Sequence, residues 1–311
     1  MRPMELRRIG SLEVSAVGLG CNNFGTRLDY FGTASVVEAA LDAGITLFDT
    51  ADIYGRGRSE EFLGELLAPR RAEVVIATKF GMEMDAGRNG AKPDYVRRAA
   101  EDSLRRLRTD YIDLYQLHRP DPATPIEQTL AALDELVRSG KVREIGCSYF
   151  TAPELSAARD AAGTNAKFAS VQNEYSLLHR EPEGGVLAEC ERQGLAFLPY
   201  YPLASGVLTG KHRWGRSVPR DTRLATDGDW ARRFLTERNL GVAEALAEYA
   251  ASRGHTLLEL AVSWLLSRPA VASVIAGASS PEQVRVNAIA GGWRLAPEDH
   301  AEVNRLTEVQ A

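Results

Sequence analysis

Short apolar runs of strand length alternate with longer segments of helical periodicity along most of the chain. Uninterrupted apolar runs are typical of strands buried on both faces, and apolar spacings of three and four residues are typical of amphipathic helices. A small hairpin, 6–9 with 12–15, precedes this alternation. The predicted buried strands are 17–20, 45–48, 74–79, 112–117, 142–148, 169–173, 195–200 and 271–275. Eight strand–helix units without a linker predict an α/β fold, a (β/α)8 TIM barrel in a single domain over residues 1–311.

A doubly wound sheet is the alternative, but Gly18-Leu19-Gly20 is only a weak trace of the glycine pattern that such folds carry after the first strand. Capping boxes are predicted at Thr124–Glu127, Thr151–Glu154 and Ser280–Gln283. The alternation of strand-like and helix-like segments stops at 201–230, which is predicted to be a loop. Extra helices are then expected towards the C-terminus, near 240–251, 256–266 and 297–309.

Three successive predicted strands end in residues that carry chemistry. Asp49 ends the strand at 45–48, Lys79 ends the strand at 74–79, and His118 follows the strand at 112–117. Tyr54 lies on the loop after Asp49. Because the carboxyl ends of barrel strands share one rim, we expect these four side chains to meet there.

An ion pair between Asp49 and Lys79 is expected, since a charge buried alone is costly. Lys79 is expected to lower the pKa of Tyr54, which makes the phenol a candidate general acid. Each residue alone is more often structural, but their joint placement on one rim indicates a catalytic site. A proton donor beside a polarised oxygen fits carbonyl reduction, given a hydride source.

The composition supports a globular protein that acts on small molecules. Hydrophobic residues make up 44%, charged residues 25%, and the net charge is −5, which argues against nucleic acid or an anionic membrane as partner. No apolar run would span a bilayer, and the N-terminus lacks a signal-peptide core. Three distant cysteines fit a reducing compartment, so a cytoplasmic location is expected. No metal site is predicted, and the oligomeric state stays open.

Several motifs resemble the signatures of the aldo-keto reductase family, and the closest branch is a bacterial one that is similar to potassium-channel β subunits. They are Phe48–Gly55, Thr78-Lys79, Leu117-His118, Gly146–Ser148, Gln172-Asn173, Tyr200–Leu203 and Gly277–Asn287. The resemblance implies a barrel that binds NADP(H) without a Rossmann domain. It also implies that Tyr54 donates the proton, that Asp49 and Lys79 tune it, and that His118 orients the substrate.

The same resemblance places the cofactor along the barrel rim, with Ser148 and Gln172 at the carboxamide and Tyr200 against the nicotinamide. Tyr149 stands where the family often has Asn, and Ser279 and Gln283 stand where many members have basic residues. NADP(H) is therefore the predicted cofactor, with NAD(H) as the alternative. The candidate cofactor residues are Gly20, Cys21, Asn22, Asp49, Ser148, Gln172, Tyr200, Leu203, Ser205, Gly206, Lys211, Arg223, Gly277, Ser279, Gln283 and Asn287.

The substrate is expected to bind among the loops of the same rim. Polar residues there (Asn22, Asn23, Arg27 and Asp29) leave sugars open, but the aromatic ones favour apolar aldehydes. The candidate substrate residues are Phe24, Tyr30, Phe31, Tyr54, Met82, His118 and Tyr149. The predicted function is NADP(H)-dependent reduction of aldehydes or ketones, or the reverse reaction. The alternatives are a nicotinamide-binding regulatory subunit with little turnover and a sugar-phosphate isomerase.

Overall fold

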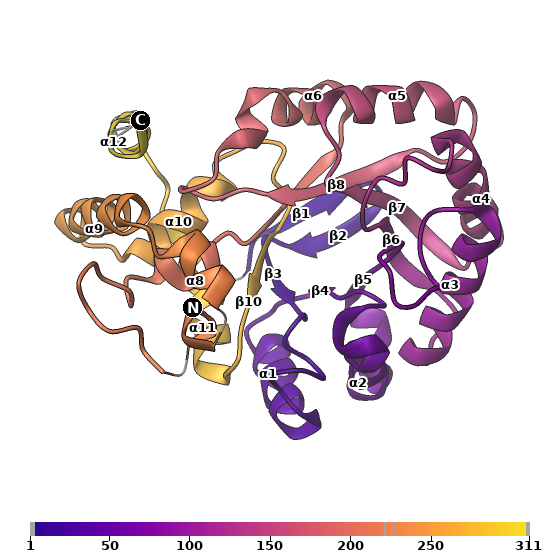
Figure 1. The fold of residues 1–311 in the computed structure, drawn as a ribbon, viewed down its shortest axis with the longest axis horizontal. Helices are drawn as coiled ribbons and strands as arrows, with labels where there is room; N and C mark the ends of the chain where they lie inside the picture. The colour runs from indigo at the N-terminus through magenta and orange to yellow at the C-terminus, as the bar shows by residue number, and fades with distance from the viewer. Residues whose placement is uncertain (1–3, 221, 227, 309–311) are drawn as a thin grey trace.

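A ring of eight parallel strands forms the centre of the computed structural model, which describes residues 4–220, 222–226 and 228–308. The strand order is β10-β3-β4-β5-β6-β7-β8-β9. The two ends of this sheet meet where Phe197 N donates to Ala270 O at 2.7 Å and Ala272 N donates to Phe197 O at 3.0 Å. The strands are β3 (Val17–Gly20), β4 (Leu47–Asp49), β5 (Val75–Phe80), β6 (Ile112–Leu117), β7 (Val142–Ser148), β8 (Phe168–Glu174), β9 (Ala196–Tyr200) and β10 (Val274–Gly277). The predicted (β/α)8 barrel is confirmed (Figure 1).

The predicted N-terminal hairpin is present as β1 (Leu6–Ile9) and β2 (Leu12–Ser15). Its side chains Ile9, Leu12 and Val14 pack into one buried cluster with residues of the barrel strands, including Leu47 and Leu114. The hairpin lies across the middle of the ring of strands in Figure 1. The interior of the barrel is therefore a packed core, and the space for ligands is left to the rim.

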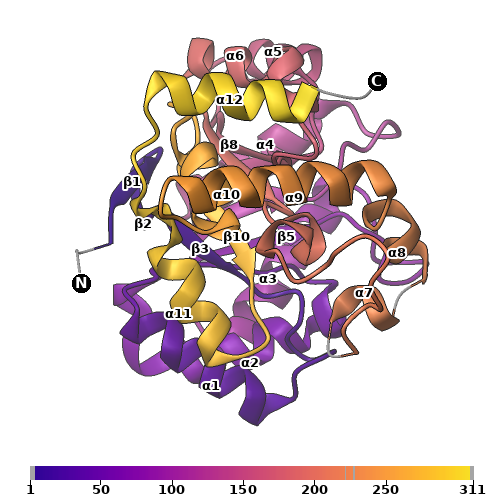
Figure 2. The ribbon, with the colours of Figure 1, turned by 90° about the vertical axis from the view of Figure 1, so that its left-hand side faces the viewer.

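Helices surround the barrel, and Figure 2 shows the C-terminal ones, α9 to α12, together on the side of β10. Among the described residues, no helix is long and apolar enough to cross a membrane. The helices are α1 (Tyr30–Asp42), α2 (Arg58–Leu67), α3 (Pro93–Leu107), α4 (Ile126–Arg138), α5 (Ala152–Ala162), α6 (Val186–Gln193), α7 (Arg223–Thr226), α8 (Gly228–Phe234), α9 (Glu237–Ser252), α10 (Leu257–Leu266), α11 (Pro281–Ile289) and α12 (Pro297–Glu308).

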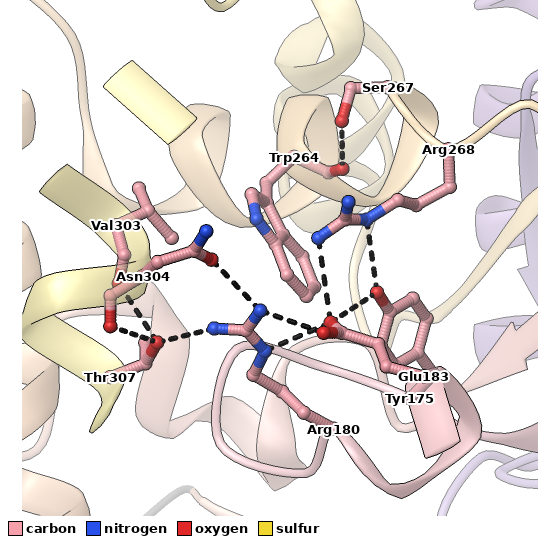
Figure 3. Close-up of polar contacts among 9 residues, drawn as sticks. All are labelled: Tyr175, Arg180, Glu183, Trp264, Ser267, Arg268, Val303, Asn304 and Thr307. Carbon is pink, nitrogen blue, oxygen red and sulfur yellow. Dashed lines mark hydrogen bonds and ion pairs between the residues drawn. The ribbon is translucent and has the colours of Figure 1, made fainter. Parts of the chain in front are cut away.

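An arginine network attaches the last helix to the barrel (Figure 3). Arg180, on the loop after β8, donates to Thr307 Oγ1 at 2.6 Å and to Asn304 Oδ1 at 2.8 Å on α12. The same guanidinium lies 5.2 Å from the ring of Trp264, which the guanidinium of Arg268 also contacts, at 4.7 Å. Position 309 of the predicted last helix lies outside the described residues.

Two predictions about local structure are wrong. The segment 201–230 is not all loop, because it contains α7, the start of α8 and a 3-10 helix over Ala204–Thr209. Trp230 of α8 lies 5.1 Å from the ring of Tyr201 and stacks on Phe234 at 5.4 Å, contacts that no local pattern reveals. The last strand, β10, is Val274–Gly277 rather than 271–275.

The helix caps agree with the sequence only in part. The capping box at Thr151 is confirmed. The box predicted at Thr124 is wrong: α4 starts after Pro125, and the Thr124 hydroxyl donates to Asp121 instead, at 2.8 Å. At α11 the hydroxyl of Ser280 accepts from Gln283 N as predicted, but Gln283 Oε1 accepts from Ser279 N rather than from the cap.

Candidate active site

Asp49 and Lys79 form a buried ion pair at the carboxyl ends of β4 and β5. Lys79 Nζ lies 2.6 Å from Asp49 Oδ2, and the two side chains are 0% and 4% exposed. Lys79 Nζ also donates to the backbone oxygen of Thr50, at 2.9 Å. Although burial opposes the charge, Asp49 leaves the pKa of Lys79 raised, so the ammonium stays charged.

Two glutamine amides complete the surroundings of Asp49. Gln172 Nε2 on β8 donates to Asp49 Oδ1 at 2.9 Å, and Gln116 Nε2 on β6 donates to the same oxygen at 3.3 Å. The backbone oxygen of Gln172 accepts from Ser148 Oγ at 2.6 Å. Sequence reasoning missed Gln116. The available signal was a polar residue inside an apolar strand, in register with Lys79 on the neighbouring strand.

Tyr54 begins a short 3-10 helix (Tyr54–Gly57) and projects towards this pair. Lys79 Nζ lies 5.2 Å from the centre of its ring, and the ring of His118 lies 6.0 Å away at 80°. Burial raises the pKa of Tyr54 to about 12, although Lys79 lowers it. The predicted net lowering is therefore wrong for the protein alone, because desolvation of the phenolate outweighs the ammonium.

His118 is a buried neutral imidazole. Burial, then Lys79 and Arg119, lower its pKa to about 2. Its Nδ1 is buried with no hydrogen-bond partner among the described residues. The ring also lines the cavity, so the other nitrogen, Nε2, is the one available to donate to a substrate oxygen beside Tyr54.

A cavity of about 430 Å³ opens on the same rim and extends from the candidate catalytic residues to α11. Tyr54, His118 and Tyr149 line it, together with every candidate cofactor residue named above. The barrel thus brings these residues together from the ends of β3, β4, β6, β7, β8, β9 and β10.

The loop after β9 has the properties of an anion cradle. Ala204, Ser205 and Gly206 have positive φ values of 45°, 55° and 100°, and successive amides in such turns point into one concavity. Ser205 Oγ is buried with no partner among the described residues. A Cβ at Gly206 would lie 2.8 Å from Lys211 Cε, so only glycine lets the lysine fold over this turn. These features fit the diphosphate of a dinucleotide.

A second group of contacts lies at the far end of the cavity. Arg223 Nη2 donates to Asn23 Oδ1 at 2.9 Å and to Asn22 Oδ1 at 3.3 Å. Asn23 Nδ2 in turn donates to the backbone oxygen of Ala278 at 3.1 Å, beside Ser279 at the start of α11. A cation is therefore held near the residues expected at the adenosine, although Glu282 lines the same end.

Tyr149 lies against the expected nicotinamide platform. Its ring centre is 5.3 Å from that of Tyr200, and the guanidinium of Arg119 lies 4.7 Å from the Tyr149 ring. Tyr149 has a φ of 63°, an uncommon conformation for an aromatic residue. The Tyr149 ring therefore lines the cavity beside Tyr200.

The predicted aromatic substrate wall is largely wrong. Phe24 is fully buried in the core, and Phe31 is 79% exposed on α1. Tyr30 packs against Phe62 and donates to Glu65 on α2. These three residues and Met82 are not among the described residues that line the cavity.

Of the four polar residues of the first loop, Asn22, Asn23 and Arg27 line the cavity. Asp29 instead caps α1, accepting from Gly32 N at 2.8 Å. No group of His, Cys, Asp or Glu able to hold a metal ion occurs in the part of the chain that the structure describes.

Comparisons with known proteins identify the family. Residues 16–308 match the profile of the Aldo/keto reductase family. The chain is 34% identical to aldo-keto reductase YhdN of Bacillus subtilis (96% of this chain, 91% of the relative) and 35% identical to L-glyceraldehyde 3-phosphate reductase of Escherichia coli K12 (91% and 86%). A probable voltage-gated potassium channel subunit beta of rice, Oryza sativa subsp. japonica, is 33% identical (91% and 90%).

Among solved structures, the glycerol dehydrogenase AKR11B4 of Gluconobacter oxydans superposes with a TM-score of 0.84 at 31% identity, covering 97% of this chain and 94% of that one. The family match extends over nearly the whole chain, and the barrel supports the same assignment. This chain therefore belongs to the aldo/keto reductase family and is an NAD(P)H-dependent oxidoreductase.

Proposed function

We propose that the protein interconverts aldehydes or ketones and the corresponding alcohols with NADP(H), and that Tyr54 is the general acid and base. The observation that supports this most is the convergence of Tyr54, His118 and Asp49 on one cavity, with Lys79 buried behind its wall and paired with Asp49. The remaining walls of that cavity carry the residues expected to hold the dinucleotide.

In this proposal the cofactor supplies or accepts the hydride, and the protein handles the proton. The substrate oxygen accepts hydrogen bonds from Tyr54 Oη and from the neutral ring of His118. As negative charge develops on that oxygen, the proton of Tyr54 moves to it. The Lys79 ammonium, kept charged by Asp49, stabilises the phenolate that remains.

Removal of the Tyr54 hydroxyl tests the proposed acid. Tyr54→Phe is expected to lower kcat by roughly 10²–10⁴-fold, the usual contribution of a positioned acid. Cofactor affinity should change little. Tyr30→Phe is the matched control, because that hydroxyl contacts Glu65 outside the cavity. Wild-type turnover by Tyr54→Phe would refute the assignment.

NADP(H) is proposed over NAD(H) because cations border the cavity at both of its phosphate-binding regions. Lys211 folds over the cradle after β9, and Arg223 is held by Asn22 and Asn23 close to Ser279. Fluorescence titration with NADPH and NADH tests this directly. Arg223→Met should weaken NADPH more than NADH. Equal affinities in the wild type, or a preference for NADH, would overturn the proposal.

For the substrate we propose short hydroxylated carbonyl compounds instead of the long apolar aldehydes that the sequence favoured. Four aromatic or apolar candidates lie off the cavity wall, so the structure gives little support to an apolar pocket. The names of the Escherichia coli and Gluconobacter relatives point to three-carbon compounds. A series of straight-chain aldehydes should then give flat kcat/KM values, below that of glyceraldehyde. A steady rise with chain length would contradict this.

The similarity to a channel subunit suggests a second candidate function, which is cofactor binding without turnover. The complete set of Tyr54, Lys79, Asp49 and His118 favours catalysis. A broad panel of carbonyl compounds distinguishes the two functions. Tight NADPH binding with no turnover on any member of the panel would favour the regulatory subunit.

A further inference from the structure

Asp52 is a buried carboxylate in the catalytic loop that the proposed reaction leaves unused. It lies between Asp49 and Tyr54, and its backbone N donates to Lys79 O at 3.1 Å. Asp52 is 1% exposed, and among the described residues neither carboxylate oxygen has a hydrogen bond of good geometry, the neighbouring Ile53 amide giving only a weak interaction. An ionised carboxylate in such surroundings is strongly disfavoured.

The positive charges near Asp52 are already paired with other carboxylates, so they do not compensate a negative charge on Asp52 itself. Glu60 on α2 is fully buried and accepts from Thr78 Oγ1 at 2.5 Å and from Arg106 Nε at 2.6 Å. Arg106 of α3 is thereby engaged with Glu60. On the other side, Lys79 is engaged with Asp49.

The other titratable groups that face Asp52 are phenols. Tyr115 comes from β6 and Tyr95 from α3, and both interact electrostatically with Asp52. The Tyr115 hydroxyl is buried and has no hydrogen-bond partner among the described residues. The guanidinium of Arg106 is thus shared by two buried carboxylates, Glu60 and Asp52, and the neighbouring groups on β6 and α3 are phenols.

The balance of these groups sets the protonation of Asp52. Burial, followed by the negative charge of Glu60, raises the pKa of Asp52 to about 7, and Arg106 and Lys79 offset this only in part. Glu60 holds the arginine, so Asp52 is the member of the pair that keeps its proton.

We propose that Asp52 is a positioning residue of the active site and is a neutral carboxylic acid in the active enzyme. Its ionisation at alkaline pH adds a second negative charge, besides Asp49, near Lys79 and slows turnover. The effect reaches the substrate through Lys79 and Tyr54, because Asp52 contacts neither substrate nor cofactor in this arrangement. The kinetic part of this inference rests on the proposed role of Tyr54.

Asp52→Asn keeps the shape of the neutral acid and removes the titration. In the wild type kcat is expected to fall by about tenfold for each pH unit above the titration of Asp52, provided that only the neutral form turns over. The variant is expected to match the wild type at low pH and to lose this alkaline limb. An unchanged limb in Asp52→Asn would overturn the proposal.

Infrared spectroscopy gives a readout that does not depend on turnover. A buried protonated carboxyl group has a carbonyl stretch distinct from that of a carboxylate, and its band should disappear with rising pH and be missing in Asp52→Asn. Absence of such a band from the wild-type spectrum at low pH would refute the neutral acid. If the band is present but Tyr54→Phe turns over normally, the proposed reaction fails while the protonation of Asp52 stands. A loss of activity at every pH in folded Asp52→Asn would indicate a purely structural residue and contradict the proposal.

Discussion

The Asp49–Lys79 pair offers the sharpest test of how this active site is held together. Both side chains are almost inaccessible to water, at 4% and 0% exposed. Truncation of one partner leaves a buried charge without its counterion, which typically costs about 3–5 kcal/mol. Lys79→Met leaves Asp49 with the neutral amides of Gln116 and Gln172, and Asp49→Asn leaves Lys79 with neutral acceptors and no counterion among the described residues.

We expect each single variant to lower the free energy of unfolding by about 3–5 kcal/mol. The double variant Asp49→Asn/Lys79→Met should lose clearly less than the sum, with a coupling of up to about 3 kcal/mol, because neither charge is then left unpaired. With a urea dependence of about 1–3 kcal/mol per molar, each single variant should show a shift of the midpoint by at least about 1 M.

The assay is urea unfolding followed by circular dichroism, with reversibility verified by refolding. The exposed pair Arg70–Glu73, with side chains 45% and 56% exposed, is the matched control, and its removal should cost no more than about 1 kcal/mol. If the two buried single variants add without coupling, the ion pair is not the interaction that orients Lys79, and the reasoning fails.

Three further outcomes are expected. Arg180→Met should lower the melting temperature and speed hydrogen exchange in α12, because it removes the hydrogen bonds to Thr307 and Asn304. Arg180→Lys should restore little of this stability. Unchanged hydrogen exchange in Arg180→Met would contradict the role of the network. The contribution of Asp52 to stability should fall by up to about 4 kcal/mol as pH rises from about 4 to about 7, since the folded pKa of Asp52 exceeds the unfolded value. The lowered pKa of His118 acts in the opposite direction, so the contribution of Asp52 is measured as the difference between the wild type and Asp52→Asn. In Asp52→Asn this contribution should disappear from urea unfolding at several pH values, and an unchanged slope would refute it. Phe31→Ser should leave kcat/KM for aldehydes within about twofold of the wild-type value, because this side chain is 79% exposed outside the cavity. A larger change would indicate that Phe31 contacts the substrate.

The sequence by itself determined the barrel and the location of its reactive residues. Uninterrupted apolar runs such as 74–77 identify strands buried on both faces, and parallel strands place their last residues on one rim. Asp49, Lys79 and His118 each end or follow such a run, so their meeting follows from local pattern plus a general rule of the fold. The Asp49–Lys79 pair was predictable because a buried charge requires a counterion.

Only the tertiary structure decided what surrounds those residues. Gln172 reaches Asp49 across 123 positions of sequence, and no periodicity announces such a contact. Phe24 and Phe31 are the same residue type but have opposite environments, buried and exposed, because the course of the chain between them depends on contacts with other elements. The raised pKa of Tyr54 and the neutral state proposed for Asp52 depend on desolvation, which is set by packing from distant segments and cannot be read from residue type.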